Sequence, residues 1–164
     1  MPSEAPSEAR FGPGQFGVGQ RVLLACTGDL TALRPALEEC RAAWPDAHFT
    51  LLIPAGEGGH LPGWAASVMA PGTFWTPDLL DRLRAGRFDA ALILTAPGDS
   101  PHGLGYLCAL AGIPVRAGVS GEFGGQTLTR WLKPARSGPG TPDPASTLLT
   151  GLFSTASCSS PERS

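Results

Sequence analysis

The sequence is poor in charged residues, and their signs nearly cancel. Charged side chains make up 16% of the 164 residues, and the formal net charge is −2. A protein that binds nucleic acid through its phosphates needs a basic surface, so this composition predicts no nucleic-acid partner. Apolar runs are also short, since the longest, Ala90 to Leu94, has the length of a strand rather than of a membrane span. We therefore expect no transmembrane segment.

Cysteine and histidine are few and scattered. The four cysteines show no CxxC spacing, and the three histidines lack the i,i+4 or cysteine-paired spacing of a metal site. This pattern predicts reduced, mostly buried thiols and no bound metal. Glu4 and Glu8 stand where a secretory signal would carry basic residues, and no apolar segment follows them. We expect a cytoplasmic protein, either free or peripheral at the inner face of the membrane.

Familiar catalytic and cofactor motifs are missing as well. The sequence has no Walker loop, no Ser-His-Asp order and no Cys-His pairing. Residues 12–17, GPGQFG, match GxGxxG formally, but they precede the first predicted strand. A dinucleotide fingerprint instead follows a strand and opens a helix. No bound cofactor is therefore predicted.

What the sequence does contain is a regular alternation of apolar strands and amphipathic helices. It predicts strands at 22–25, 49–53, 89–94 and 114–117. It predicts helices at 32–44, from 77 to about 84 with a stop at Gly86, and at 104–111. The first helix is placed near Ala32 because Pro35 is tolerated only in a first turn. Residues 64–75 are ambiguous and fit a short helix and a further strand. The alternation predicts an α/β fold, a Rossmann-like doubly wound parallel sheet.

Composition divides the chain into three parts. Residues 1–19 are polar and rich in Pro and Gly, and we expect them to be a disordered lead-in. Residues 20–133 hold all the predicted elements and form one domain. From 134 to 164 the composition shifts to Pro, Gly, Ser and Thr, which predicts a low-complexity, largely disordered tail.

Gly28 and Asp29 form a tight turn between the first strand and the first helix. In open α/β sheets, ligands bind at this edge, outside the carboxyl ends of the strands. The Asp29 carboxylate has two uses there: it can cap the helix by accepting backbone N–H bonds, or it can act as a general base toward an attacking hydroxyl. Gly28 lets backbone and substrate come close. The residues alone leave both uses open.

Two later loops are predicted to reach the same edge. The loop at 95–103 offers Ser100 and His102 as acceptor-binding side chains, and the loop after the last predicted strand offers Glu122 and Gly124. A glutamate can accept hydrogen bonds from sugar hydroxyls, and glycines can present backbone N–H groups to a sugar or phosphate. Ordinary turns with exposed polar residues explain the same pattern.

Several blocks in a fixed order resemble family 9 glycosyltransferases, the heptosyltransferase-like group. The Gly28-Asp29 turn is followed by PAL at 35–37, and WPDA at 44–47 precedes the second strand. The later blocks are RLRAGRFDAALILTAPGDSP, LAGIPVRAG and EFGG. The resemblance spans about residues 21–131, the N-terminal half of such enzymes, and the ordered series is more specific than any single block.

This resemblance implies the N-terminal half of a GT-B fold, in which two Rossmann-like domains enclose the active site. The N-terminal domain would hold a sugar or a lipid-linked glycan acceptor, and a second domain would bind the nucleotide-sugar. Carried over from the family, Asp29 would deprotonate the acceptor hydroxyl for an inverting attack on an ADP-heptose-like donor. The residues after Trp131 do not resemble a donor domain. We therefore expect a truncated chain, or a half completed by a separate donor-binding domain, that is inactive alone.

Two other functions fit the same residues. A non-catalytic module would keep the sugar-binding cleft without transfer, and a flavodoxin-like domain would bind a nucleotide at the same edge. Sugar transfer that depends on Asp29 separates the glycosyltransferase from the first alternative. Specific binding of a flavin or dinucleotide favours the flavodoxin-like domain. The sequence alone leaves open whether the chain is an enzyme.

Overall fold

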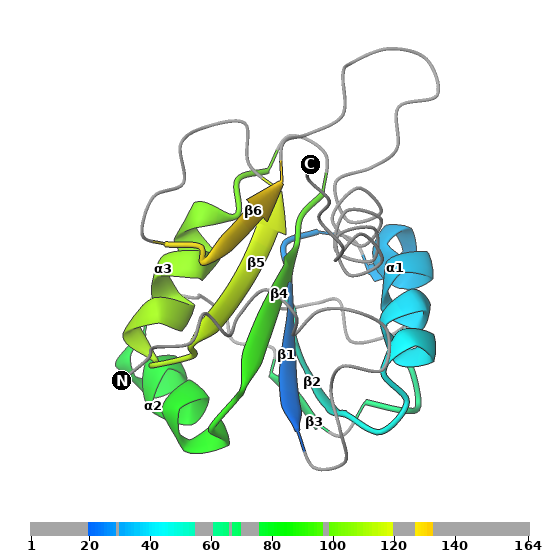
Figure 1. Cartoon of the computed structure of the whole chain (residues 1–164), viewed down its shortest axis with the longest axis horizontal. Coiled ribbons are helices and arrows are strands. Elements are labelled where there is room, and N and C mark those ends of the chain that lie inside the picture. Colours follow the sequence, from blue (N-terminus) through cyan, green and yellow to red (C-terminus); the bar gives the residue numbers. More distant parts are fainter. Residues whose placement is uncertain are drawn as a thin grey trace, which may run out of the picture.

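The computed structural model describes residues 20–28, 30–54, 61–65, 67–69, 76–96, 99–119 and 127–132. Residues 130–132 are described as backbone alone. In chain order its elements are β1 (Arg21–Cys26), α1 (Leu30–Ala43), β2 (His48–Leu52), β3 (Ser67–Met69), α2 (Pro77–Gly86), β4 (Ala90–Leu94), α3 (His102–Leu110), β5 (Val115–Val119) and β6 (Arg130–Leu132) (Figure 1). The predicted lead-in and tail lie outside the described residues, so the domain limits stay predictions.

Six strands form one sheet in the order β3-β2-β1-β4-β5-β6, and each neighbouring pair is parallel. The chain moves outward from β1 to β3, returns to the middle at β4, and continues outward on the other side to β6. The direction of travel reverses between β1 and β4, whose register ends at Cys26↔Leu94. The doubly wound parallel sheet confirms the predicted fold class. It also places a topological switch point at the carboxyl ends of β1 and β4.

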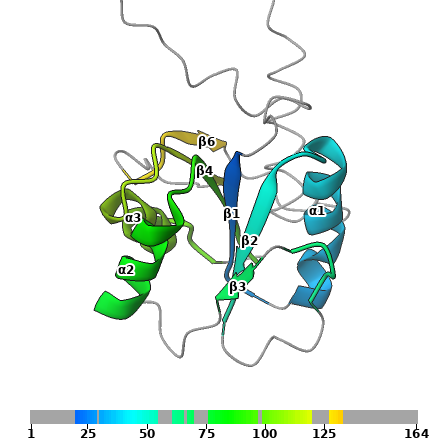
Figure 2. The ribbon, with the colours of Figure 1, turned by 90° about the horizontal axis from the view of Figure 1, so that it is seen from below.

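Helices cover both faces of the sheet. α1 lies on one face, and α2 and α3 lie on the other (Figures 1 and 2). β1 contributes to both layers, because Val22, Leu24 and Cys26 pack in the core with α1, whereas Leu23 and Ala25 pack in the core with α2 and α3. All five side chains are fully buried. Burial on both faces explains the uninterrupted apolar run of β1, and each buried leucine stabilises the fold by roughly 1.5–3 kcal/mol.

The first helix begins earlier than its proline suggests. α1 starts at Leu30, two residues before the predicted Ala32, and Pro35 consequently lies inside the helix. An internal proline costs about 3 kcal/mol. Leu30 and Leu33 are only 1% and 3% exposed in the core beneath α1. Their burial, at roughly 1.5–3 kcal/mol each, offsets that cost, so tertiary packing sets the start of α1.

The second helix starts where its sequence predicts, and it continues past the predicted Arg84 to the predicted stop at Gly86. The Thr76 hydroxyl caps α2 by accepting a hydrogen bond from the N–H of Leu79 at 3.2 Å, and Pro77 is the first helical residue. The helix ends at Gly86, and Arg87 adopts the left-handed conformation with φ 51°. Cap, N-terminal proline and stop are all local signals, which is why the sequence locates this helix well.

The two shortest strands depend on their neighbours. β3 lies within the ambiguous segment 64–75, in which a short helix and a further strand were expected. It pairs with β2, and the hydroxyls of Thr50 and Ser67 lie 2.9 Å apart. β6 was not predicted. It pairs with β5 and is preceded by Thr129, whose N–H donates to the carbonyl of Arg116 at 2.9 Å. Three-residue strands carry too little periodicity to be recognised in a sequence.

Trp64 packs at the edge of the core beneath α1. Its ring meets Phe49 edge to face, with centroids 5.5 Å apart. Its indole N–H lies 3.3 Å from both carboxylate oxygens of Glu38 on α1. The stretch around Trp64 therefore covers the core. Within the described part of the chain, none of the helices has the length and apolar character needed to cross a membrane.

Candidate functional site

The carboxyl ends of β1 and β4 stay joined beyond the strands themselves. The N–H of Thr27 donates to the carbonyl of Leu94 at 3.2 Å, which continues the ladder one residue past Cys26. Thr95, the first residue after β4, is only 1% exposed. The two chain segments therefore leave the sheet side by side at the switch point. In sheets of this kind the crevice outside this point is where ligands bind.

A side-chain contact links the two segments. The hydroxyl of Thr27 accepts a hydrogen bond from the N–H of Ala96 at 3.0 Å and donates one to Oδ2 of Asp99 at 2.7 Å. A second bond, from the N–H of Asp99 to the carbonyl of Ala96 at 3.0 Å, closes the β4–α3 loop on itself. A hydroxyl serves both roles at once, and a bond to a carboxylate is stronger than one between neutral groups. Thr27 thus fixes an exposed carboxylate at the switch point.

Position 28 must be glycine because the turn after β1 and the loop after β4 lie very close together here. A Cβ at this position would stand 2.7 Å from the Cβ of Ala96. Real side chains do not approach so closely, and the neighbour is a rigid methyl group next to the backbone rather than a flexible side chain. Gly28 is therefore needed for the packing of the turn on the β4–α3 loop. Its predicted close approach to a substrate stays a prediction.

Asp29 lies outside the described residues. It stands in the chain between Gly28, packed against Ala96, and Leu30, the first residue of α1. The position directly before the first helical residue is the one at which aspartate caps a helix. The turn also belongs to the switch point, where a general base would meet a ligand. Its assignment as the base stays a prediction.

Ser100 and His102 follow Asp99 along the same loop. Ser100 is exposed, and its hydroxyl accepts a hydrogen bond from the N–H of His102 at 3.2 Å. His102, the first residue of α3, is half-buried, and its Nδ1 lies 2.8 Å from the hydroxyl of Thr127. Ser100 therefore shares the edge with the Thr27–Asp99 contact. His102 joins α3 to the segment before β6 as well.

The loop after β5 is described only where it returns to the sheet. Glu122 and Gly124 lie outside the described residues, so their predicted part in acceptor binding stays a prediction. Thr127 and Leu128 pack closely on α3, because a Cβ on Gly105 would stand 2.9 Å from the carbonyl oxygen of Thr127. Leu128 is 2% exposed. The end of this loop is thus anchored beside the same edge.

Two residues of the site were not recognised in the sequence. Thr27 and Asp99 are 72 positions apart. Asp99 lies in the block that ends in TAPGDSP, and Thr27 directly precedes the Gly28-Asp29 turn, but neither was singled out as a site residue. Thr27 directly follows β1, and Asp99 lies in the loop that follows β4. A sequence search restricted to polar residues in these loops would have included both. Their contact follows from the pairing of β1 with β4.

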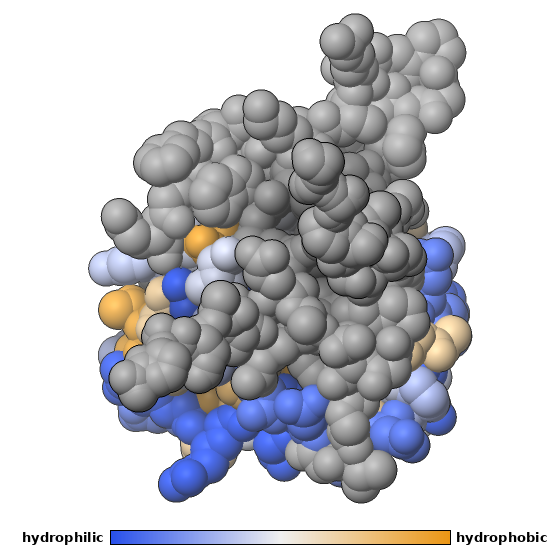
Figure 3. All heavy atoms as spheres, viewed as in Figure 1, coloured by the Kyte–Doolittle hydropathy of each residue, from blue (hydrophilic) through white to orange (hydrophobic). Residues whose placement is uncertain are grey.

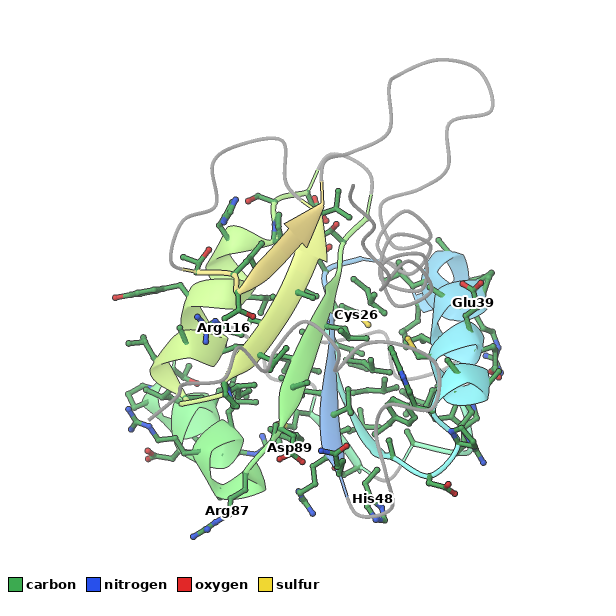
Figure 4. All side chains as sticks on the ribbon, viewed as in Figure 1. Cys26, Glu39, His48, Arg87, Asp89 and Arg116 are labelled. Carbon is green, nitrogen blue, oxygen red and sulfur yellow. The ribbon has the colours of Figure 1, made fainter. Side chains whose placement is uncertain are left out.

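The described thiols are structural rather than reactive. Cys26, Cys40 and Cys108 are buried and free, as predicted. Figure 4 shows Cys26 in the interior, between the sheet and α1. Burial raises the pKa of Cys26 and of Cys108 to about 12, and it raises the pKa of Cys40 as well. Protonated, inaccessible thiols are poor nucleophiles. Within the described residues, no three His, Cys, Asp or Glu side chains gather to hold a metal ion.

Comparisons with known proteins bear on the fold. No protein-family model matches the chain, and no curated protein matches its sequence. Among solved structures, the chain is similar to a glycosyl transferase family 9 structure from Veillonella parvula, with a TM-score of 0.56 and 16% identity over 84% of this chain and 41% of that one. It also aligns with the E. coli ADP-heptose lps heptosyltransferase II, with a TM-score of 0.49 and 22% identity over 66% and 34%.

The Veillonella match shows a shared fold. At 16% identity the likeness concerns the arrangement of the chain alone. The resemblance to family 9 that the sequence blocks suggested is confirmed at this level. The chain spans about two fifths of that structure, since the match covers 41% of its length.

Proposed function

We propose that the chain is the acceptor-side domain of a GT-B glycosyltransferase of the family 9 type. The observation that carries the proposal is the switch point between β1 and β4, where Gly28 packs on Ala96 and Thr27 holds Asp99. A ligand edge of this kind, on a fold shared with part of a family 9 structure, supports acceptor binding at this place. The acceptor is proposed to be a sugar or a lipid-linked glycan on the cytoplasmic side of the membrane.

Asp29 is proposed as the general base. Its carboxylate takes the proton of the acceptor hydroxyl, and the hydroxyl oxygen then attacks the anomeric carbon of an ADP-heptose-like donor. As the new C–O bond forms, the bond from the anomeric carbon to the diphosphate oxygen breaks. The nucleoside diphosphate leaves with that electron pair. Attack from the side opposite the leaving group inverts the anomeric configuration.

Transfer also needs a domain that binds the donor. The departing diphosphate carries charge that must be neutralised, and such electrostatic stabilisation is usually the largest catalytic contribution. We propose that a second Rossmann-like domain, on the same polypeptide or on another, supplies it. Residues 1–164 by themselves are expected to bind an acceptor and to transfer no sugar at a useful rate.

The topology argues against the nucleotide-binding alternative. A flavodoxin-like sheet has the order 2-1-3-4-5, whereas this sheet runs β3-β2-β1-β4-β5-β6. Dinucleotide-binding sheets share the observed order, but they carry a glycine fingerprint in the first strand-to-helix turn. Here that turn is only Thr27, Gly28 and Asp29. A fingerprint that starts at Gly28 would need glycines at positions 30 and 33, and both are leucines.

Ligand binding to the full chain tests the proposal first. A ¹⁵N-labelled sample is titrated with FMN, NAD⁺ and an ADP-hexose, and separately with simple sugars. We expect a sugar, and none of the three nucleotides, to shift the amide signals of Thr27, Gly28 and Asp99. A nucleotide that binds tightly at these amides contradicts the acceptor-side assignment.

A reconstituted transfer reaction tests the role of Asp29. The chain is mixed with the donor-binding domain of a family 9 enzyme, a nucleotide-sugar and an acceptor. Asn caps a helix as well as Asp does but cannot take a proton. Asp29→Asn is therefore expected to leave the unfolding midpoint unchanged while lowering the transfer rate by about 10²–10⁴-fold. Asp78→Asn, the same change in the first turn of α2, is the matched control.

The outcomes of this reaction separate the candidate functions. Full turnover by Asp29→Asn shows that Asp29 is not the base. Tight sugar binding without transfer under any combination of donor and partner indicates a non-catalytic sugar-binding module. Transfer by the chain alone contradicts the expectation that a donor-binding domain is required.

A further inference from the structure

Each end of β1 is held to a connection of β4 by an aspartate. At the edge where both strands begin, Oδ2 of Asp89 accepts the N–H of Arg21 at 2.8 Å, and the N–H of Asp89 donates to the carbonyl of Arg21 at 2.8 Å. At the edge where both strands end, Oδ2 of Asp99 accepts the hydroxyl of Thr27 at 2.7 Å. The two carboxylates therefore make comparable contacts at opposite ends of one strand pair.

The two contacts differ in what surrounds them. Asp89 lies with Arg87 and His48 at the edge where β1 and β4 begin (Figure 4). Hydrophilic residues gather along this lower edge in the space-filling view (Figure 3). Asp99 instead lies at the switch point, beside the turn of residues 27–29. Because ligands of such sheets bind outside the carboxyl ends of the strands, only the Asp99 contact lies where it can act on a ligand.

The Thr27 hydroxyl closes a ring of three hydrogen bonds. It donates to Asp99 at 2.7 Å and accepts from the N–H of Ala96 at 3.0 Å. The N–H of Asp99 donates to the carbonyl of Ala96 at 3.0 Å. A hydroxyl has one hydrogen, so its bond to Asp99 directs the oxygen lone pairs toward Ala96. Hydrogen bonds linked in this way polarise and strengthen one another.

The chain on either side of position 29 is anchored as well. The N–H of Thr27 donates to the carbonyl of Leu94 at 3.2 Å. Gly28 is packed so closely on Ala96 that a Cβ would stand 2.7 Å from the Ala96 Cβ. Leu30, the first residue of α1, is only 1% exposed in the core. The neighbours of the proposed base are therefore fixed relative to the β4–α3 loop and to the sheet.

We propose that Thr27 and Asp99 are positioning residues for the transfer step, because they hold the turn that carries Asp29 against the β4–α3 loop. This inference rests on the proposed acceptor-side function with Asp29 as the base. A base must come within about 2.6–3.2 Å of the group whose proton it takes. A displacement of about 1 Å can lower the rate by about 10²-fold. Thr27 and Asp99 act through the position of Asp29, and neither takes the proton.

The reconstituted transfer reaction tests this role with two disruptive variants. The full chain is combined with the donor-binding domain of a family 9 enzyme, a nucleotide-sugar and an acceptor. Thr27→Val removes the hydroxyl of the ring, and Asp99→Ala removes the carboxylate. Each is expected to lower kcat by about 10–10²-fold. The ratio kcat/KM is expected to fall by the same factor, because the contact serves the transition state rather than acceptor binding.

Conservative variants and a matched control separate positioning from stability. Thr27→Ser keeps the hydroxyl, and Asp99→Asn keeps an oxygen that accepts its hydrogen, so both are expected to restore most of the rate. Asp89→Ala is the control, since it removes the comparable contact at the opposite end of β1. It is expected to leave kcat unchanged. The melting temperature of every variant is measured, and rates are compared at a temperature at which all of them are folded.

Hydrogen exchange reports the ring without any reaction. The N–H of Ala96 bonds to the Thr27 hydroxyl, so its exchange rate follows this contact. Thr27→Val is expected to speed exchange at Ala96 by about 2–10-fold, the ratio that corresponds to the net contribution of one hydrogen bond. Thr27→Ser and Asp89→Ala are expected to leave that exchange slow. Equal exchange in Thr27→Val and the unaltered chain contradicts the ring and overturns the inference.

The kinetic results divide in the same way. The inference is overturned if Thr27→Val and Asp99→Ala leave kcat unchanged, or if Asp89→Ala lowers kcat as much as Asp99→Ala does. It is also overturned if the conservative variants are as slow as the disruptive ones. Transfer that needs Asp29 but neither Thr27 nor Asp99 refutes only the positioning role. The absence of transfer with every donor and partner refutes the proposed function, and the positioning role with it.

Discussion

Replacing Gly28 with alanine tests the packing that creates the site. The new Cβ would stand 2.7 Å from the Cβ of Ala96, about 0.7 Å short of ordinary van der Waals contact. The turn after β1 must then move away from the β4–α3 loop. That movement stretches the bond from the Thr27 hydroxyl to Asp99, now 2.7 Å, and the bond from the Thr27 N–H to Leu94, now 3.2 Å.

The expected cost follows from overpacking at one rigid contact. Inserting a methyl group into a tightly packed place costs about 1–3 kcal/mol, and the stiffer unfolded chain of alanine returns at most about 0.4–1 kcal/mol. We therefore expect Gly28→Ala to lower the free energy of unfolding by about 1–2 kcal/mol. This corresponds to a fall in melting temperature of roughly 2–8 °C. Chemical denaturation and thermal melts of the full chain measure both.

Two companion variants separate this contact from general effects of the substitution. Gly63→Ala is the matched control, since a Cβ there meets nothing within 4 Å, and it is expected to change stability by less than about 0.5 kcal/mol. Ala96→Gly removes the opposing methyl group, after which the nearest atom to the new Cβ is the Ala96 Cα at 3.8 Å. The double variant is therefore expected to regain about 1 kcal/mol relative to Gly28→Ala, less the backbone cost of a new glycine.

The reasoning is refuted by either of two results. One is that Gly28→Ala is as mild as Gly63→Ala. The other is that Ala96→Gly adds its own cost to Gly28→Ala without any rescue. In both cases the two segments would not be in the contact described, and the Thr27–Asp99 bond would lose its structural support.

Other predictions concern the local signals and the buried thiols. Thr76→Ala is expected to cost about 1 kcal/mol by removing the cap on α2, whereas Thr76→Asp retains it, as denaturant unfolding will show. Iodoacetamide at pH 8 is expected to spare Cys26 and Cys108 in the folded chain and to label both in urea, read by peptide mass spectrometry. Burial raises the pKa of both thiols from 9.0 to about 12, so unfolding is favoured as the pH rises above 9. The stability from each thiol is complete below pH 9 and declines up to about pH 12, with a slope of at most about 1.4 kcal/mol per pH unit. Cys26→Ala is expected to flatten this slope, measured as denaturation midpoints from pH 8 to 10.

Local patterns located most of the elements because each reports its own burial or its own cap. The apolar run of β4 is a strand buried on both faces, and Thr76 and Pro77 mark the start of α2 without help from distant residues. The predicted start of α1 was wrong because the packing of Leu30 and Leu33 outweighs the local signal of Pro35. β6 had no local signal at all.

The sequence by itself determined a doubly wound α/β fold and an edge where loops with hydroxyls and carboxylates meet. Alternation of apolar strands and helices is enough for this, since parallel strands joined by helices must place their carboxyl ends on one side. The tertiary structure decided which two loops touch. Thr27 meets Asp99 because β1 and β4 are adjacent at the point where the strand order reverses. Strand order depends on how whole layers pack, and no periodicity along the chain records it.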